Sequence, residues 1–218
     1  MVEKQKKNKR RYNIFINDEY AFSVHEDIIV KHRLLKGENV DAQQIAQILQ
    51  DEERHGAYLK AIVMLGRRPH SSKEVKRKLQ QKGYEEDIVG WAVATLEQQN
   101  YINDEEFAKL WAEQRVVLQK KGRNIIKQEL QQRGLSRDHI HEAIGTINAE
   151  EEFQGALHLA EKKWKQTKGI MIERKRKTAS FLLRRGFTNT VVNKVLQQVS
   201  QSANEDEFEE VFDIDAID

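Results

Sequence analysis

The 218-residue chain has no cysteine and only one proline, Pro69. Without cysteine it can form no disulfide bond, and it has no thiolate to serve as a nucleophile or a metal ligand. Proline interrupts helices, so its near absence leaves long segments free to form them. Charged residues make up 33% of the chain, which suits helices with one solvated face. These features favour a mainly helical protein in a reducing compartment.

Long apolar runs are also missing. The longest one, residues 61–65, is far too short to cross a bilayer. The charged N-terminus is not followed by the apolar stretch of a signal peptide. We therefore expect a cytoplasmic protein that makes no contact with a membrane.

The common catalytic motifs do not occur. No Gly-Lys pair is present, which excludes a Walker A phosphate loop, and neither Gly-x-Gly-x-x-Gly nor Gly-x-Ser-x-Gly is found. His139 and His141 are two residues apart, so on a helix their side chains point about 200° apart and cannot bind one ion. Paired glutamates such as Glu105 and Glu106 stand at expected helix starts, where they offset the helix dipole. We expect no enzymatic activity, no metal site and no cofactor.

The charge is unevenly distributed. All eight charged residues from position 201 onward are acidic. The whole chain carries +2 and this segment carries −8, so the rest of the chain carries +10. A basic body suggests a polyanionic partner or an acidic protein surface. We expect residues 201–218 to be a disordered acidic tail that either folds over the basic body and competes with DNA or only aids solubility.

One pattern occurs three times along the chain. Leu-x-x-(Lys/Arg)-Gly followed by an apolar residue stands at 79–84, 130–135 and 182–187, and further apolar residues recur nine, ten and thirteen positions after each glycine. Such a glycine ends a helix in the left-handed conformation, and the later positions form one apolar helix face. Helix starts are predicted at Asp41, Ser71, Asn103 and Asn148. The sequence therefore predicts three tandem three-helix repeats, 41–100, 101–147 and 148–200, in an elongated array.

Residues 1–40 differ from the repeats. Lys4–Arg11 forms a basic arm that we expect to be disordered. Apolar residues then alternate with other residues on both sides of a turn at Asn17-Asp18, which predicts a β-hairpin. Ser23 and Glu26 have the spacing of a capping box and predict a short helix from about residue 24 to residue 34. The fold class is thus mainly α with a short N-terminal β-hairpin.

Clusters of cations are the candidate binding residues. The densest segment, 162–185, holds ten cations and one acidic residue, Glu173. Smaller clusters stand just before the second helix of the first and second repeats. If the repeats stack regularly, these clusters form a basic stripe that contacts phosphates, although such runs are often only solvated helix faces. The candidates are Arg67, Arg68, Lys120, Lys121, Arg123, Arg174, Lys175, Arg176, Lys177, Arg184 and Arg185.

Trp91, Trp111 and Trp164 are the residues best suited to stack on bases. Trp111 and Trp164 share helical spacing with neighbouring apolar residues, which is typical of a core. We expect all three to be mainly core residues.

Several motifs resemble those of the RecX family. They are Arg67–Val75 with Leu79 and Lys82-Gly83-Tyr84, Asn100–Ala108, and Gly122 followed by Ile126, Glu129-Leu130 and Arg133-Gly134-Leu135. Residues 12–24 are similar to the N-terminal extension of Gram-positive members. The resemblance covers nearly all of residues 11–200. Met64 departs from it, because relatives often carry an aromatic residue there.

The resemblance implies three tandem three-helix repeats and binding in the groove of the RecA–single-stranded-DNA filament. It also implies inhibition of RecA strand exchange, ATP hydrolysis and coprotease activity, with effects on DNA repair, recombination and the SOS response. We expect a monomer whose partners are the RecA filament and, weakly through charge, single-stranded DNA. A different reading is a helical nucleic-acid-binding regulator without a RecA partner, because three-helix units can resemble helix-turn-helix domains.

Overall fold

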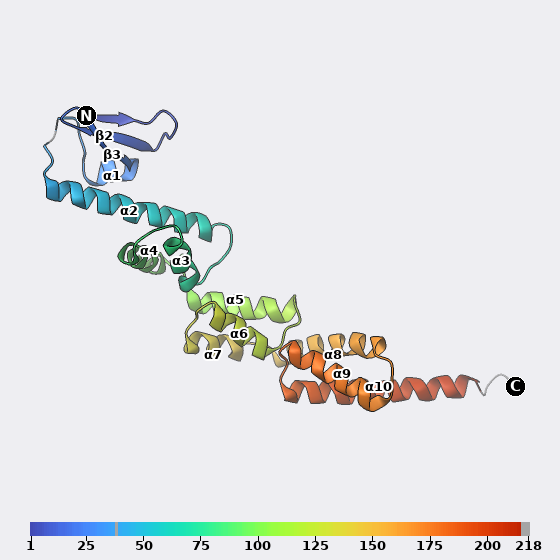
Figure 1. Cartoon of the computed structure of the whole chain (residues 1–218). Helices are drawn as coiled ribbons and strands as arrows, with labels where there is room; N and C mark the ends of the chain where they lie inside the picture. The colour runs from blue at the N-terminus through green and yellow to red at the C-terminus, as the bar shows by residue number, and fades with distance from the viewer. Residues whose placement is uncertain (38, 215–218) are drawn as a thin grey trace. The chain divides into compact units, whose positions relative to one another are not determined.

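The computed structural model describes residues 1–37 and 39–214, with side chains as far as residue 202. It divides into two compact units, Met1–Ile102 and Asn103–Asp218 (Figure 1). Among the described residues, no helix is both long and apolar enough to span a membrane.

A three-stranded antiparallel sheet opens the first unit. Its strands are β1 (Val2–Lys4), β2 (Arg11–Ile16) and β3 (Glu19–His25), in that order. Asn17 and Asp18 both have positive φ, 50° and 65°, as a two-residue hairpin turn of type I′ requires. The predicted hairpin is therefore confirmed.

The sequence did not predict the third strand. Residues 1–4 pair with β2, with Val2 opposite Ile14, and the backbone N–H of Gln5 donates to the Arg11 carbonyl at 2.9 Å. The expectation of a disordered arm at Lys4–Arg11 is thus wrong at both ends, because Lys4 belongs to β1 and Arg11 to β2. The error has a physical cause: β1 is short and largely charged, so its pairing depends on β2 rather than on a pattern of its own.

Helix α1 (Glu26–Lys31) is shorter than predicted and begins at a different residue. Ser23 belongs to β3, and His25 is the N-cap, its Nδ1 accepting the backbone N–H of Asp27 at 3.3 Å. Arg33 then takes a left-handed conformation (φ 49°), which ends the helix ahead of the predicted boundary.

Nine further helices form the three predicted repeats in the described chain (Figure 1). They are α2 (Ala42–Leu65), α3 (Ser72–Gln80) and α4 (Glu86–Gln98), then α5 (Asp104–Val117), α6 (Arg123–Gln132) and α7 (Arg137–Gly145), then α8 (Ala149–Gln166), α9 (Met171–Arg184) and α10 (Asn189–Ile214). The four predicted caps are confirmed, since each accepts a backbone N–H from the first turn of its helix.

Each repeat has its own core, built on the recurring pattern. The glycine after the second helix is left-handed in all three, at Gly83 (φ 89°), Gly134 (φ 82°) and Gly186 (φ 87°). The pattern leucines and the residues nine positions after the glycines are fully buried: Leu79, Leu130, Leu182, Ala92, Ala143 and Val195. The structure thus confirms that these positions form the repeat cores.

The last helix extends into the acidic segment. α10 runs to Ile214, so the backbone from position 201 to 214 is helical where the sequence predicts disorder. Residues 215–218, the end of the predicted tail, lie outside the described residues.

Candidate functional site

Helix α9 carries several exposed cations of the candidate set. α9 buries Thr178 and Leu182 against its own repeat, while Lys175, Arg176 and Arg184 are exposed. No ion pair of these three is found within the described side chains. They are spread over the solvent-exposed half of the helix, with Lys175 and Arg184 on opposite flanks of it, and we call the three together the free basic face of α9.

Exposed aliphatic side chains lie next to this face in the sequence. Ile172 is 75% exposed, and Ile170 and Leu183 are also exposed. Lys177 lies 3.7 Å from Glu173, one turn back, so its charge is partly offset. The face therefore offers both cations and apolar groups to a partner.

Arg174 stands in the same run but has an internal role. Its guanidinium lies 4.5 Å from the centroid of the buried Trp164 ring, and its Nη2 is 3.5 Å from the Trp164 carbonyl oxygen. A partly desolvated cation–π contact of this kind is a stabilising one. Arg174 therefore fastens α9 to the end of α8.

Arg185 belongs to a junction between the second and third repeats. Its Nη2 donates to the Gln119 carbonyl at 2.7 Å, and its own carbonyl accepts the backbone N–H of Gly122 at 2.9 Å. A second backbone bond runs from the Asn124 N–H to the Gly186 carbonyl, also at 2.9 Å. The start of α6 is thus bonded directly to the end of α9.

Lys121 and its neighbours surround one carboxylate on α6. Glu129 accepts from Trp111 Nε1 at 3.0 Å and from Arg115 Nε at 2.9 Å, and Lys121 Nζ forms an ion pair with its other oxygen. Burial raises the pKa of Glu129, but the hydrogen bonds from Lys121, Arg115 and Trp111 outweigh it, and the net pKa is lowered. Lys121 is therefore committed to an internal ion pair.

Arg123 is tied to a buried acid on α8. Its Nε lies 2.6 Å from Oε2 of Glu152, which is 2% exposed, and its backbone N–H donates to the other oxygen at 3.1 Å. Its Nη2 also donates to the Ile147 carbonyl at 2.9 Å. A buried carboxylate needs such a partner, so this pair is structural.

Lys120 is half-buried, with a positive φ of 47°, and its aliphatic stem packs on Gly155. Of the three candidate cations of the second repeat, Lys121 and Arg123 thus have their charged groups in internal ion pairs, whereas Lys120 packs against the protein only through its stem.

Arg67 and Arg68 lie in the loop between α2 and α3, in the first unit. Both are exposed. Arg68 Nη1 donates to the Pro69 carbonyl at 2.8 Å and lies 3.3 Å from Glu74. Within the described side chains Arg67 makes no ion pair, so it is the more accessible of the two.

The tryptophans differ in accessibility. Trp164 is buried, and the Trp111 ring has the guanidinium groups of Arg115 and Arg133 at 3.7 and 3.6 Å from its centroid. Trp91 is 38% exposed, so the expectation of a core residue is wrong there. Its ring lies 5.7 Å from the Arg54 guanidinium.

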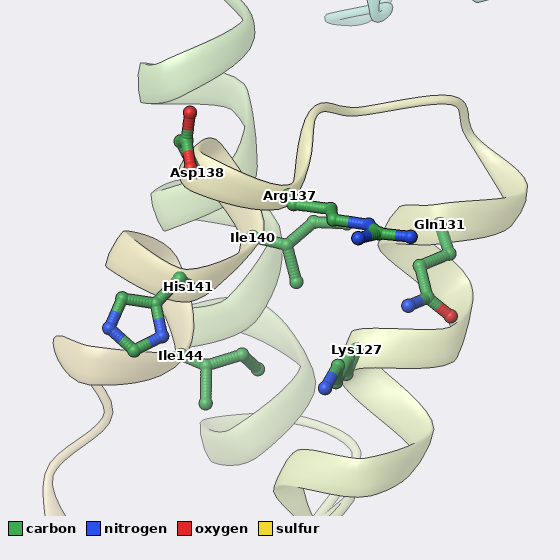
Figure 2. A pocket seen from close by; sticks show the side chains of 7 residues that line it. All are labelled: Lys127, Gln131, Arg137, Asp138, Ile140, His141 and Ile144. Atoms are coloured by element: carbon green, nitrogen blue, oxygen red, sulfur yellow. The ribbon is translucent and has the colours of Figure 1, made fainter.

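A pocket of about 530 Å³ lies between α6 and α7. Figure 2 shows the Arg137 guanidinium extending toward Gln131, with Lys127 from α6 and His141 and Ile144 from α7 on the same hollow. The lining mixes cations with apolar side chains, and the described residues around it include no nucleophile paired with a base.

Sequence reasoning missed one cluster altogether. His25, Asp27 and His55 place three ligand atoms within 4.8 Å of one another. His25 and His55 are thirty positions apart, on different elements, so no local spacing could have indicated their approach.

Models of the RecX family match the chain in four places. The regulatory protein RecX N-terminal domain matches residues 1–41, and the first, second and third three-helix domains of RecX match 57–96, 103–144 and 150–196.

Named relatives and solved structures indicate the same family. The regulatory protein RecX of Bacillus cytotoxicus is 31% identical over 214 residues, covering 96% of this chain and 79% of the relative. The protein of the same name from Halalkalibacterium halodurans is 34% identical over 211 residues, covering 94% and 79%. A crystal structure of regulatory protein RecX superposes with a TM-score of 0.76 at 28% identity, covering 89% of this chain and 96% of that one. RecX from Lactobacillus salivarius is 21% identical, covering 69% of this chain and 99% of that one, and it shares the fold with a TM-score of 0.66. The chain therefore belongs to the RecX family of regulatory proteins.

Proposed function

We propose that this protein is a negative regulator of RecA. It binds the RecA–single-stranded-DNA filament and inhibits the recombinase, ATPase and coprotease activities of RecA. The observation that carries the proposal is the match of all four RecX domain models along one chain.

The free basic face of α9 is the contact surface that we propose. A filament on single-stranded DNA is rich in phosphate, and cations that reach phosphates gain binding energy by releasing counterions. Lys175, Arg176 and Arg184 are exposed and need not break an internal ion pair to do so. Aliphatic neighbours such as Ile172 can contact the protein part of the filament. Arg67 is a second proposed contact, in the first unit.

The test is DNA-dependent ATP hydrolysis by RecA while the protein is titrated in. The variant Lys175→Glu, Arg176→Glu, Arg184→Glu should need at least about tenfold more protein for half inhibition. A single surface ion pair contributes only about 0–1 kcal/mol, so three reversals are combined. The matched control reverses three exposed lysines spread over the repeats: Lys82→Glu, Lys127→Glu and Lys194→Glu.

The outcomes separate the possibilities. Equal inhibition by the α9 variant and the parent would exclude the α9 face as the contact surface. No inhibition by the parent, together with tight binding to a specific duplex sequence, would replace RecA regulation with the nucleic-acid-binding alternative. Circular dichroism of every variant confirms that it is folded.

A further inference from the structure

Three potential metal ligands converge where β3, α1 and α2 meet in the first unit. The Nδ1 of His25 lies 3.3 Å from Oδ2 of Asp27 and 3.1 Å from Nε2 of His55. The same Nε2 of His55 lies 3.2 Å from Oδ2 of Asp27. The three atoms thus form a nearly equilateral triangle. Within the described residues, no other such group of histidine and acidic side chains occurs.

The backbone holds these side chains in place. His25 ends β3 and caps α1, and its backbone N–H donates to Oε2 of Glu52 at 2.7 Å. Glu52 also pairs with Arg11 on β2 at 2.8 Å. His55 follows Glu52 by three residues on α2, so both side chains are on the same face of that helix. The ligands therefore come from elements that are already joined by other bonds.

The size of the triangle fits a tetrahedral transition-metal ion. With metal–ligand distances of 2.0–2.1 Å, adjacent ligands in a tetrahedral site are about 3.3–3.4 Å apart. The observed separations, 3.1–3.3 Å, are within a few tenths of that. An ion about 0.9 Å above the centre of such a triangle reaches all three atoms at bonding distance.

The donor set selects the kind of ion. Two imidazole nitrogens and one carboxylate oxygen suit Zn²⁺ and its neighbours, whereas Ca²⁺ and Mg²⁺ require oxygen ligands. We propose that His25, Asp27 and His55 form a binding site for a divalent transition metal, with Zn²⁺ as the expected ion. The Asp27 side chain is 60% exposed, which leaves a fourth position open to water.

Metal binding would change the hydrogen bonds that the two histidine rings make in the metal-free protein. The Nδ1 of His25 accepts the Asp27 backbone N–H at 3.3 Å, so a bound ion would take this lone pair in place of the cap bond. In the metal-free protein, one proton on Nε2 of His55 satisfies the contacts to its two neighbours. Metal binding needs His55 to be neutral with its proton on Nδ1.

A bound ion would hold three elements of the first unit together. It would link the end of β3 and the first turn of α1 to α2 through metal–ligand bonds. An ion that binds only the folded state raises stability by mass action. The site therefore predicts metal-dependent stability of the first unit, independent of any contact with RecA.

The experiment uses the tag-free full-length protein after treatment with a chelator. Calorimetric titration with Zn²⁺ should show one equivalent bound and a higher melting temperature. Titration with Co²⁺ should give the visible absorption bands of a tetrahedral ion. Asp27→Asn and His55→Gln should each weaken Zn²⁺ binding more than about tenfold, because loss of even an outer-shell partner can cost 10–100-fold.

The matched control is the double variant His139→Gln, His141→Gln, which removes two histidines outside the cluster and should bind Zn²⁺ like the parent. Less than one equivalent bound by the parent would overturn the proposal, leaving a hydrogen-bonded cluster only. Zn²⁺ binding by Asp27→Asn that is as tight as that of the parent would also overturn it. This variant decides the matter if His55→Gln fails to fold, because the Asp27 side chain is largely exposed.

Discussion

Gly122 shows how closely two repeats approach at a single residue. A Cβ added there would lie 2.2 Å from the backbone nitrogen of Phe187 and 2.3 Å from the carbonyl carbon of Gly186. Both atoms belong to the backbone, so they cannot move aside as a flexible side chain would. The backbone bonds from Gly122 and Asn124 to the end of α9 depend on this approach.

We predict that Gly122→Ala destabilises the second unit. The methyl group must push the start of α6 away from α9, and overpacking of this kind typically costs about 1–3 kcal/mol. Gly145→Ala is the matched control, because a Cβ there meets no atom within 4 Å and alanine is favoured over glycine in a helix by about 0.5–1 kcal/mol. Thermal and chemical unfolding should thus shift in opposite directions for the two variants. A Gly122→Ala protein as stable as the parent would contradict the tight junction.

The cations of this chain illustrate what sequence alone cannot distinguish. Arg123 and Arg176 both stand in basic clusters, yet Arg123 bonds a buried carboxylate and Arg176 is exposed. The partner of Arg123, Glu152, is 29 positions away, so its role depends on tertiary structure. Clusters of charge could be located from the sequence, but which cations are accessible could not.

At the level of elements, the helices were predictable where the signal is local. Caps act over three residues and apolar faces over one or two turns, so Ser71, Asn103 and the repeat glycines could be recognised directly. Strand β1 could not, because three residues hold no period and their partner is β2. The bonds between α6 and α9 were also hidden, because they join residues more than sixty positions apart.

Glu129 on α6 accepts hydrogen bonds from Trp111 and Arg115 on α5, so the stability that these bonds provide should depend on pH. Its folded pKa is lowered from the ordinary value of 4.5, so it binds protons less readily in the folded state. Its stabilising effect is therefore present above that value and is lost as the pH falls through the folded pKa. We predict that Glu129→Gln is less stable than the parent at pH 7, by about 1–3 kcal/mol for lost bonds to charged groups.

The difference in the free energy of unfolding between the parent and Glu129→Gln should shrink as the pH falls below about 4.5. Chemical denaturation at pH 7 and pH 4 measures it. Glu113→Gln is the control, because Glu113 is an exposed α5 glutamate with no ion pair among the described side chains. A stability difference between the parent and Glu129→Gln that is the same at both pH values would show that Glu129 does not titrate as the geometry requires.

At the scale of the whole molecule, each of the three sequence repeats corresponds to a separate hydrophobic core. Each repeat buries its own leucine and alanine or valine positions, while the sheet and α1 pack around Ile14, Val24, Ile28 and Ile48. Exposed basic residues occur in both units: Arg67 in the first and the free basic face of α9 in the second. Under the proposed function, each of the two compact units thus offers exposed cations that can contact phosphates.

The acidic end of the chain bears on the proposed contact of these cations with DNA. All eight acidic residues follow Ser200. Helix α10 carries those up to position 214, and it packs against α9 in the same repeat. Their negative charge is therefore attached to the repeat that presents the free basic face. Truncation after Ser200 keeps the buried Val192, Val195 and Val199 and should leave the fold intact.

We predict that this truncation tightens binding to single-stranded DNA and steepens its salt dependence. Each added phosphate contact changes the slope of log K against log salt by about −0.7 on single strands. Fluorescence anisotropy at several salt concentrations measures the slope. A full-length chain with the eight acids changed to their amides tests whether charge or chain length is responsible, and it should behave like the truncation. If both variants keep the slope of the parent, the acids do not compete with DNA for the basic face, and their effect is confined to solubility.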